Sequence, residues 1–356
     1  MLPAAHGDCL WIEYGDEKNI NRILIDTGTA ATYKTLRERI LKIPLKERRF
    51  ELFIITHVDA DHIEGALPLL QDEELGVQFG DVWFNGWKHI TDMLGPIQGE
   101  FLSSLLETQN RRWNNAFAGK AAVVSEKGKL PVIRLKGGMK ITLLSPSKEK
   151  LSALRPLWKT VVEGEGLEPG NTTQALERLR EKKKFRPADL LGKIDVEKSA
   201  DVPFVSDDKA ANGSSIAILA EYDEKRCLFA ADAHAPLLET TIDRLMTQRG
   251  LERLTLDAFK IPHHGSKKNL NKGLLQKLVC DRYLISTNGN QFNHPDDDAI
   301  SRIIKYGQSF QSESPILFFN YRSKSNEKWE NQQWRDRYKY ETVYPDDNLN
   351  GLSVAL

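Results

Sequence analysis

Residues 51–66 have the sequence ELFIITHVDADHIEGA, in which an apolar run ends in a group of four polar side chains. A short β-rich run of this kind predicts a buried strand. The polar side chains would then lie in the loop beyond its carboxyl end, where open α/β sheets usually hold ligands; they are His57, Asp59, Asp61 and His62. Extended backbone points His57 and Asp59 to the same side, and a turn brings the other two in from the opposite direction.

Two imidazoles and two carboxylates that converge in one loop have the composition of a metal site. The alternative is a solvated acidic loop in which the histidines have no role. We favour the metal site, because four ligand-type side chains at alternate and adjacent positions directly after a buried strand are hard to obtain by accident.

This stretch resembles the signature H-x-H-x-D-H of the metallo-β-lactamase superfamily. The chain has H-V-D-A-D-H at residues 57–62, so Asp59 stands where the family usually has its second histidine. The resemblance implies two divalent metal ions. Zinc is favoured, and manganese is a competitor because the carboxylate makes the first metal position harder and more anionic.

The resemblance extends from Gly7 to Pro295 and implies an α/β fold, the αββα sandwich of two mixed sheets flanked by helices, with the site at one edge between the sheets. We expect residues 1–356 to form a single domain with a charged, partly helical insertion at about residues 146–211. Helices are expected at residues 32–43, 101–117 and 297–306. Strands are expected at residues 9–14, 22–25, 82–84, 132–135, 140–144, 216–221, 226–230, 257–262, 283–286, 316–319 and 351–356.

Three further polar residues are expected to support the metal ligands rather than bind metal. Asp8 belongs to the opening G-D-C, which resembles the start of the ComEC-type metallo-β-lactamase domain of DNA-uptake proteins; the alternative is a turn residue. Asp26 ends the second strand in D-T-G. Asn212 occupies the place where the family often has a histidine.

Two later motifs follow predicted strands. Residues 231–233 are Ala-Asp-Ala, and in the family the corresponding Asp, here Asp232, bridges two metals; Ala231 replaces the usual Gly, which we expect to matter little. Residues 263–267 are His-His-Gly-Ser-Lys, in which one histidine would bind metal while its neighbour faces substrate. Ser266 and Lys267 are groups that bind phosphate. The alternative is a pair of histidines that cap a core strand.

The resemblance assigns the ligands residue by residue. His57 and Asp59 would hold one metal ion, while Asp61, His62 and His264 hold the other and Asp232 bridges, although the choice between His263 and His264 as ligand stays open. Two ions about 3.5–4 Å apart lower the pKa of a shared water and clamp the attacked group. Asp61 would orient the resulting hydroxide. His263 and His294, the latter in N-x-x-N-H-P at the mouth of the site, would contact substrate or leaving group.

Composition limits the classes of function. The chain has 50 basic and 50 acidic residues, so its overall charge does not indicate nucleic acid or a membrane as partner. We find no signal peptide and no run of about 20 apolar residues. The cysteines are odd in number and scattered, at Cys9, Cys227 and Cys280, which excludes a disulfide framework. We therefore expect a cytoplasmic protein without a membrane segment.

The chemistry predicts a metallo-hydrolase, with a phosphodiesterase or nuclease acting on DNA or RNA as first choice. A hydrolase of small phosphodiesters such as phosphorylcholine esters is the second. The third is a catalytically silent binding module in a larger assembly with an unidentified protein partner. Three basic segments could contact a polynucleotide: Lys267-Lys268 beside the metals, residues 182–184, and Arg335–Lys339 within residues 329–344, where aromatic and basic side chains interleave. For residues 329–344 we favour a half-exposed edge strand.

Overall fold

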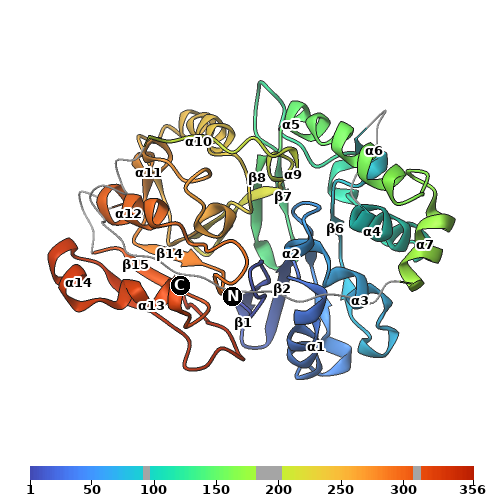
Figure 1. Ribbon diagram of the computed structural model, residues 1–356, viewed down its shortest axis with the longest axis horizontal. Coiled ribbons are helices and arrows are strands. Elements are labelled where there is room, and N and C mark those ends of the chain that lie inside the picture. Colours follow the sequence, from blue (N-terminus) through green and yellow to red (C-terminus); the bar gives the residue numbers. More distant parts are fainter. Residues whose placement is uncertain (91–96, 182–202, 308–313) are drawn as a thin grey trace.

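The computed structural model describes residues 1–90, 97–181, 203–307 and 314–356. It is a mixed α/β structure built around two larger sheets (Figure 1). The first sheet has the strand order β1-β2-β4-β6, with β1 antiparallel to β2 and the other pairs parallel; its strands are β1 (Leu10–Asp16), β2 (Asn19–Ile25), β4 (Leu52–Ile54) and β6 (Val82–Trp83).

The second sheet has eight strands in the order β16-β15-β14-β12-β10-β9-β8-β7. Pairs from β16 to β10 are parallel, and pairs from β10 to β7 are antiparallel. Its strands are β7 (Val132–Arg134), β8 (Lys140–Ser145), β9 (Ala217–Tyr222), β10 (Lys225–Phe229), β12 (Ala258–Lys260), β14 (Arg282–Ile285), β15 (Ile316–Phe319) and β16 (Glu341–Val343). Two small sheets pair β3 (Arg49–Phe50) with β5 (Gln78–Phe79) and β11 (Leu254–Thr255) with β13 (Leu278–Val279).

The alternation of side chains along the first sheet shows how the layers pack. Ile23 and Ile25 belong to the same buried cluster as Ile141 of the second sheet, so these two sheets face each other across a shared core. Leu24 lies between them in sequence and belongs to a separate cluster with Leu36 of the helix α1 (Tyr33–Leu41). The second half of β2 and all of β4 are therefore buried on both faces, which explains their continuous apolar sequence, whereas β1 at the sheet edge has exposed residues such as Glu13 and Asp16.

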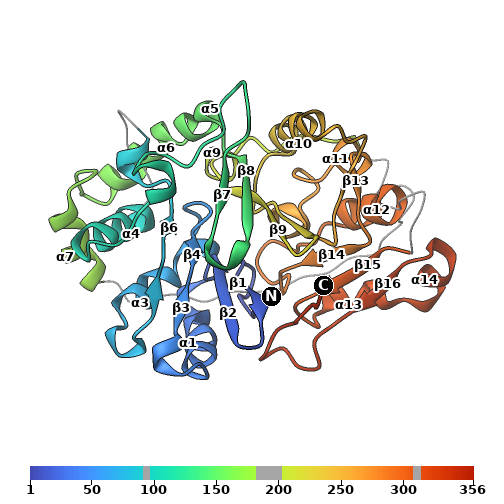
Figure 2. The ribbon, with the colours of Figure 1, turned by 180° about the vertical axis from the view of Figure 1, so that it is seen from behind.

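Helices cover both outer sides of the pair of sheets, as the two opposite views show (Figures 1 and 2). On the side of the first sheet lie α1 (Tyr33–Leu41), α3 (Ala66–Gln71) and α4 (Ile97–Thr108), and on the side of the second lie α10 (Ala235–Arg249), α11 (Lys272–Gln276) and α12 (Asp297–Tyr306). The remaining helices are α2 (Ala60–Ile63), α5 (Lys148–Ala153), α6 (Arg155–Gly164), α7 (Thr172–Glu181), α9 (Ala210–Gly213), α13 (Lys324–Glu327) and α14 (Gln332–Tyr338). Among the described residues, no helix has the length and apolar character needed to cross a membrane.

Most predicted elements are confirmed, but three are wrong in part. The helix expected at residues 101–117 is α4, which begins at Ile97 and ends at Thr108. Residues 351–356 form no strand. The segment 329–344 contains a strand only at β16; its longest element is α14, whose first turn is capped by the side chain of Asn331. The basic residues 182–184 lie outside the described part of the chain.

Candidate metal centre

Loops from both sheets meet at one edge of the molecule and bring the predicted ligands together. His57, Asp59, Asp61 and His62 follow β4 of the first sheet, whereas Asp232 follows β10 and His263 and His264 follow β12 of the second. The backbone joins the two sheets here, because Ile216 N–H donates to the carbonyl of Thr56 at 2.9 Å. Parallel β10 and β12 deliver their carboxyl ends to the same edge, as ligand sites in such sheets require.

Asp232 lies at the centre of this group, and its two carboxylate oxygens face different partners. Oδ2 is 3.8 Å from His57 Nε2 and 3.6 Å from His263 Nε2. Oδ1 is 3.5 Å from His62 Nε2 and 3.9 Å from His264 Nε2. We call the residues that face Oδ2 the first set and those that face Oδ1 the second set. Asp59 belongs with the first set, because its Oδ2 lies 3.7 Å from His57 Nε2. Asp61 belongs with the second, because its Oδ2 lies 3.5 Å from His264 Nε2.

Hydrogen bonds at the far side of each imidazole ring fix its orientation. In all four rings Nδ1 lies within hydrogen-bonding distance of an oxygen outside the cluster, which leaves Nε2 free to face Asp232. The partners are Thr56 Oγ1 for His57 (3.0 Å), Asp26 Oδ2 for His62 (2.7 Å), Asn269 Oδ1 for His263 (2.9 Å) and the Ser286 carbonyl for His264 (2.8 Å). Histidines that bind metal are oriented by partners of this kind.

Buried polar atoms without partners indicate what the cluster could hold. His57 Nε2 and Asp232 Oδ1 are buried and have no hydrogen bond, which is costly for polar groups in an interior. His62 Nε2 and His264 Nε2 lie 3.1 Å apart. Two nitrogens that bind one ion at about 2.0–2.1 Å are separated by roughly 3 Å. These buried His and Asp groups could hold a metal ion.

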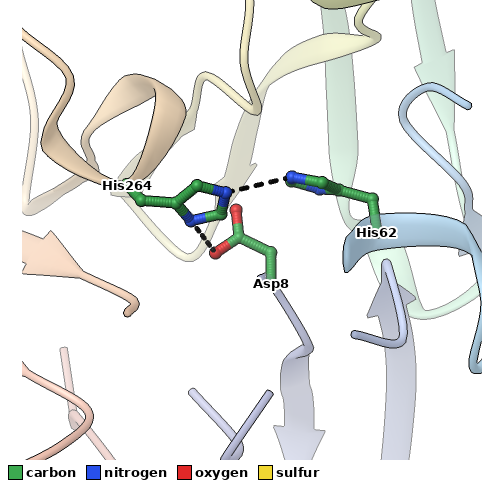
Figure 3. Close-up of side chains that lie close together, drawn as sticks. All are labelled: Asp8, His62 and His264. Atoms are coloured by element: carbon green, nitrogen blue, oxygen red, sulfur yellow. Dashed lines mark hydrogen bonds and ion pairs between the residues drawn. The ribbon is translucent and has the colours of Figure 1, made fainter. Parts of the chain in front are cut away.

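Asp8 approaches the same cluster from the segment before β1 (Figure 3). It forms a group with His62 and His264 that could by distance hold an ion, and His57, His62 and Asp232 form another. Asp8 is a weaker candidate ligand than Asp232, because Asp8 Oδ2 already accepts a hydrogen bond from Lys260 Nζ at 2.7 Å, whereas Asp232 faces both His57 and His62. Asp8 Oδ1 is 3.6 Å from His264 Nδ1, so this carboxylate lies behind the ring, opposite Nε2.

Charge coupling dominates the cluster. Burial alone would raise the pKa of Asp232, but the charges of His263, His62 and His264 outweigh it, so the pKa lies well below its ordinary value. Burial would lower the pKa of His62, and the carboxylates of Asp232, Asp26 and Asp61 instead raise it well above its ordinary value. Without another cation, the histidines themselves neutralise the carboxylates. A divalent ion would take over that role.

A cavity of about 230 Å³ opens onto the cluster. Asp59, Asp61, Asp232 and His263 line it together with the predicted substrate residues Ser266, Lys267 and His294. Lys267 is not free, because its Nζ pairs with Asp298 Oδ2 at 3.1 Å. His294 Nδ1 is buried without a hydrogen bond and lies 3.6 Å from Asp296 Oδ1.

Two of the three expected supporting residues contact the rings directly. Asp26 bonds to His62, and its other oxygen accepts from the Thr56 backbone N–H at 2.8 Å. Asn212 Nδ2 lies 3.3 Å from His263 Nδ1 and donates to Asp207 Oδ2 at 2.6 Å.

Three residues near the centre were missed in the sequence. Asp207 Oδ2 lies 3.5 Å from His263 Nδ1, and Asn269 holds both Asp207 (3.0 Å) and the carbonyl of Asp232 (3.0 Å) through its amide nitrogen. Lys260, on β12, is fully buried. The sequence did carry a signal for Lys260, because a lysine within a predicted apolar strand that leads to two histidines is unusual. Asp207 has no local signal, because it follows a long charged stretch.

The backbone at the site adopts the left-handed region at several non-glycine residues, among them Asp26 (φ +56°), Ala231 (φ +48°), His263 (φ +47°) and His264 (φ +53°). This region costs an L-residue roughly 1–2 kcal/mol. The replacement of Gly by Ala231 therefore matters more than the sequence suggested. Strain of this kind accumulates where function requires a particular geometry.

Comparisons with known proteins add no assignment: no protein-family model matches the chain, and no curated protein gives a significant match.

Proposed function

We propose that this chain is a metal-dependent hydrolase of the metallo-β-lactamase fold that cleaves phosphodiesters. The observation that carries the proposal is Asp232, which faces His57 and His263 with one oxygen and His62 and His264 with the other. A carboxylate between two such sets suits two divalent ions that share it. Two sheets packed face to face under outer helices support the fold assignment.

His57, Asp59 and His263 would hold one ion, and Asp61, His62 and His264 the other. Both histidines of the pair are then ligands, which differs from the expectation that one of them faces substrate. The first set combines two imidazoles with the exposed carboxylate of Asp59. Zinc suits this donor set best, and manganese is the competitor.

The charges around the cavity favour an anionic substrate once metal is bound. Five carboxylates (Asp59, Asp61, Asp207, Asp232 and Asp296) and three lysines (Lys209, Lys267 and Lys268) line it. These side chains alone leave an excess of two negative charges. Two divalent cations reverse the balance to an excess of two positive charges. A phosphodiester fits this environment better than a cationic or apolar substrate.

Divalent ions in such a pair activate a water molecule and stabilise the charge that develops on the attacked group. The chain's own residues position the reactants. Asp61, at the rim of the second set, orients the attacking water and holds its proton. His294 Nδ1, which makes no hydrogen bond to the described residues, would hydrogen-bond to a substrate oxygen. Phe292 and His294 line the cavity, and the His6 ring packs edge-on against Phe292.

Cleavage of a small diester such as a phosphorylcholine ester is the second candidate. The cavity volume of about 230 Å³ favours it, because pockets that enclose drug-sized ligands usually exceed about 300 Å³.

The test measures hydrolysis of single-stranded DNA, duplex DNA, RNA and bis-p-nitrophenyl phosphate by the purified protein. Activity should disappear on chelation and return with zinc or manganese. Asp61→Asn should lower the rate at least about 100-fold. Asp208→Asn, a neighbouring exposed carboxylate, is the matched control and should have no effect. No hydrolysis with added metal, or activity that survives chelation, would contradict the proposal.

A further inference from the structure

Phe292 combines exposure with a place at the cavity in a way that the proposed chemistry does not explain. It lies in the loop between β14 and α12, lines the cavity and is 46% exposed. In the described part of the chain it is the one Phe, Tyr or Trp in the exposed class. An aromatic ring is costly to expose and is more often buried. Its exposure next to the candidate metal centre therefore points to a ligand.

The loop holds this ring in place from both ends. Asn288 N–H donates to the Ala5 carbonyl at 2.9 Å, and Asp296 N–H donates to the Gly265 carbonyl at 2.9 Å. The ring of Phe292 packs edge-on against His6, with centroids 5.7 Å apart at 80°, and lies 6.2 Å from the His294 ring. The side chain is thus supported on two sides while nearly half of it remains open.

Two lysines form another part of the cavity lining. Asp207 joins their loops, because its backbone N–H donates to the Lys268 carbonyl at 3.1 Å and its Oδ1 accepts from the Lys209 N–H at 3.1 Å. Both side chains are exposed. Unlike Lys267, neither has an ion pair among the described residues. Their ammonium groups are therefore available to an anion.

We propose that Phe292, Lys209 and Lys268 form a nucleotide subsite, in which a nucleobase stacks on Phe292 and the two lysines contact phosphates on either side of the scissile bond. The inference rests on the proposed function for the position of that bond. The cavity is too small to enclose a whole dinucleotide, so the base must lie at its rim, where Phe292 is. The preferred substrate class is then single-stranded nucleic acid, whose bases are free to stack.

A small choline-type diester would not use the two lysines, because its headgroup is a cation that they repel. Duplex nucleic acid presents no free base face to Phe292. The subsite therefore separates the three substrate classes that the metal chemistry alone leaves equivalent.

The test measures binding to the metal-loaded protein by calorimetry, with two probes that contain no diester to cleave. One is thymidine 3′,5′-bisphosphate, and the other is the same sugar bisphosphate without the base. The unaltered protein should bind the base-bearing probe roughly 5- to 150-fold more tightly, which corresponds to the contribution of one stacked base. Phe292→Leu should remove this difference, and Phe292→Tyr should keep it.

The double variant Lys209→Ala/Lys268→Ala should weaken binding of both probes by a similar factor. With tetrathymidylate, it should lower the slope of log affinity against log salt by roughly one per lysine. The matched control is Lys127→Ala/Lys129→Ala, a pair of exposed lysines that do not line the cavity, and it should leave binding and hydrolysis unchanged.

Equal affinity of the unaltered protein for both probes, or a base preference that survives Phe292→Leu, would overturn the subsite. Hydrolysis of bis-p-nitrophenyl phosphate is measured in parallel to keep the two proposals apart. Activity without a Phe292-dependent base preference would leave the hydrolase proposal standing and remove the subsite. A Phe292-dependent base preference without hydrolysis of any diester would support the subsite and refute the hydrolase.

Discussion

The ion pair between Lys260 and Asp8 should be one of the strongest single contributions to stability near the site. Lys260 is 0% exposed and Asp8 is 1% exposed, and Nζ lies 2.7 Å from Oδ2. Breaking a buried pair by removing one partner leaves an uncompensated charge and typically costs 3–5 kcal/mol. In Lys260→Met, the His264 ring still lies next to the Asp8 carboxylate and partly compensates its charge. We therefore expect this change to cost about 3 kcal/mol, at the lower end of that range.

A double-mutant cycle separates the pair from other effects of the substitution. Asp8→Asn alone should also cost about 3 kcal/mol, because it leaves a buried ammonium group. The double variant should cost no more than either single variant, which corresponds to a coupling of about 3 kcal/mol. The assay is urea unfolding followed by tryptophan fluorescence, with chelator present so that metal loss does not contribute.

Lys225→Met is the matched control, because its ammonium group pairs with Asp257 at 3.1 Å while the lysine side chain is 50% exposed. This change should cost less than about 1 kcal/mol. The reasoning would be refuted if Lys260→Met cost as little as this control. It would also be refuted if the effects of Lys260→Met and Asp8→Asn were additive.

Three further predictions concern the ligand set, the strained backbone and a buried histidine. Asp59→His should raise the ratio of zinc-supported to manganese-supported activity, because imidazole is the softer ligand; an unchanged or lower ratio would exclude Asp59 as a ligand. Ala231→Gly should stabilise the protein by up to about 1 kcal/mol in thermal unfolding, because glycine adopts φ of +48° without strain; a lower melting temperature would contradict this. Burial, assisted by the charge of Lys88, lowers the pKa of His89 to about 4. The unfolded chain takes up this proton near pH 6.5, so the neutral ring's contribution to stability is complete above that pH and is lost as pH falls toward 4. His89→Gln should reduce the acid destabilisation in this window by about 2 kcal/mol, and urea unfolding at pH 7 and pH 5 with an unchanged difference would show that His89 does not titrate this way.

Local sequence was enough to predict the parts of the site that follow strands. His57, Asp59, Asp61 and His62 lie directly after β4, and His263 and His264 lie just after β12, so strand periodicity alone places them at the sheet edge. Their mutual arrangement around Asp232 needed the tertiary structure, because each set of ligands combines residues from both sheets.

The sequence could not predict residues whose role depends on distant partners. Asp207 contacts His263, Asn212 and Asn269, and the last of these is 62 positions away in sequence. The prediction of an edge strand at residues 329–344 was wrong for a different reason. Trp334 and Tyr338 alternate with basic residues as in a strand, but they are also four positions apart, which places them on one face of α14. Both pack against the core that contains Trp329. Burial against this core therefore favoured the helical arrangement over the strand.

The measurement that tests the central claim most directly is the metal content of the purified protein and of Asp232→Asn by elemental analysis. After incubation with zinc or manganese and removal of the excess, the unaltered chain should hold two divalent ions. Asp232→Asn should lose at least one of them while its circular dichroism spectrum stays the same, because the remaining ligands no longer share a bridging charge. Asp223→Asn, in an exposed turn, is the matched control and should hold two. An unaltered chain that binds no stoichiometric metal, or an Asp232→Asn variant that retains both ions, would contradict the account.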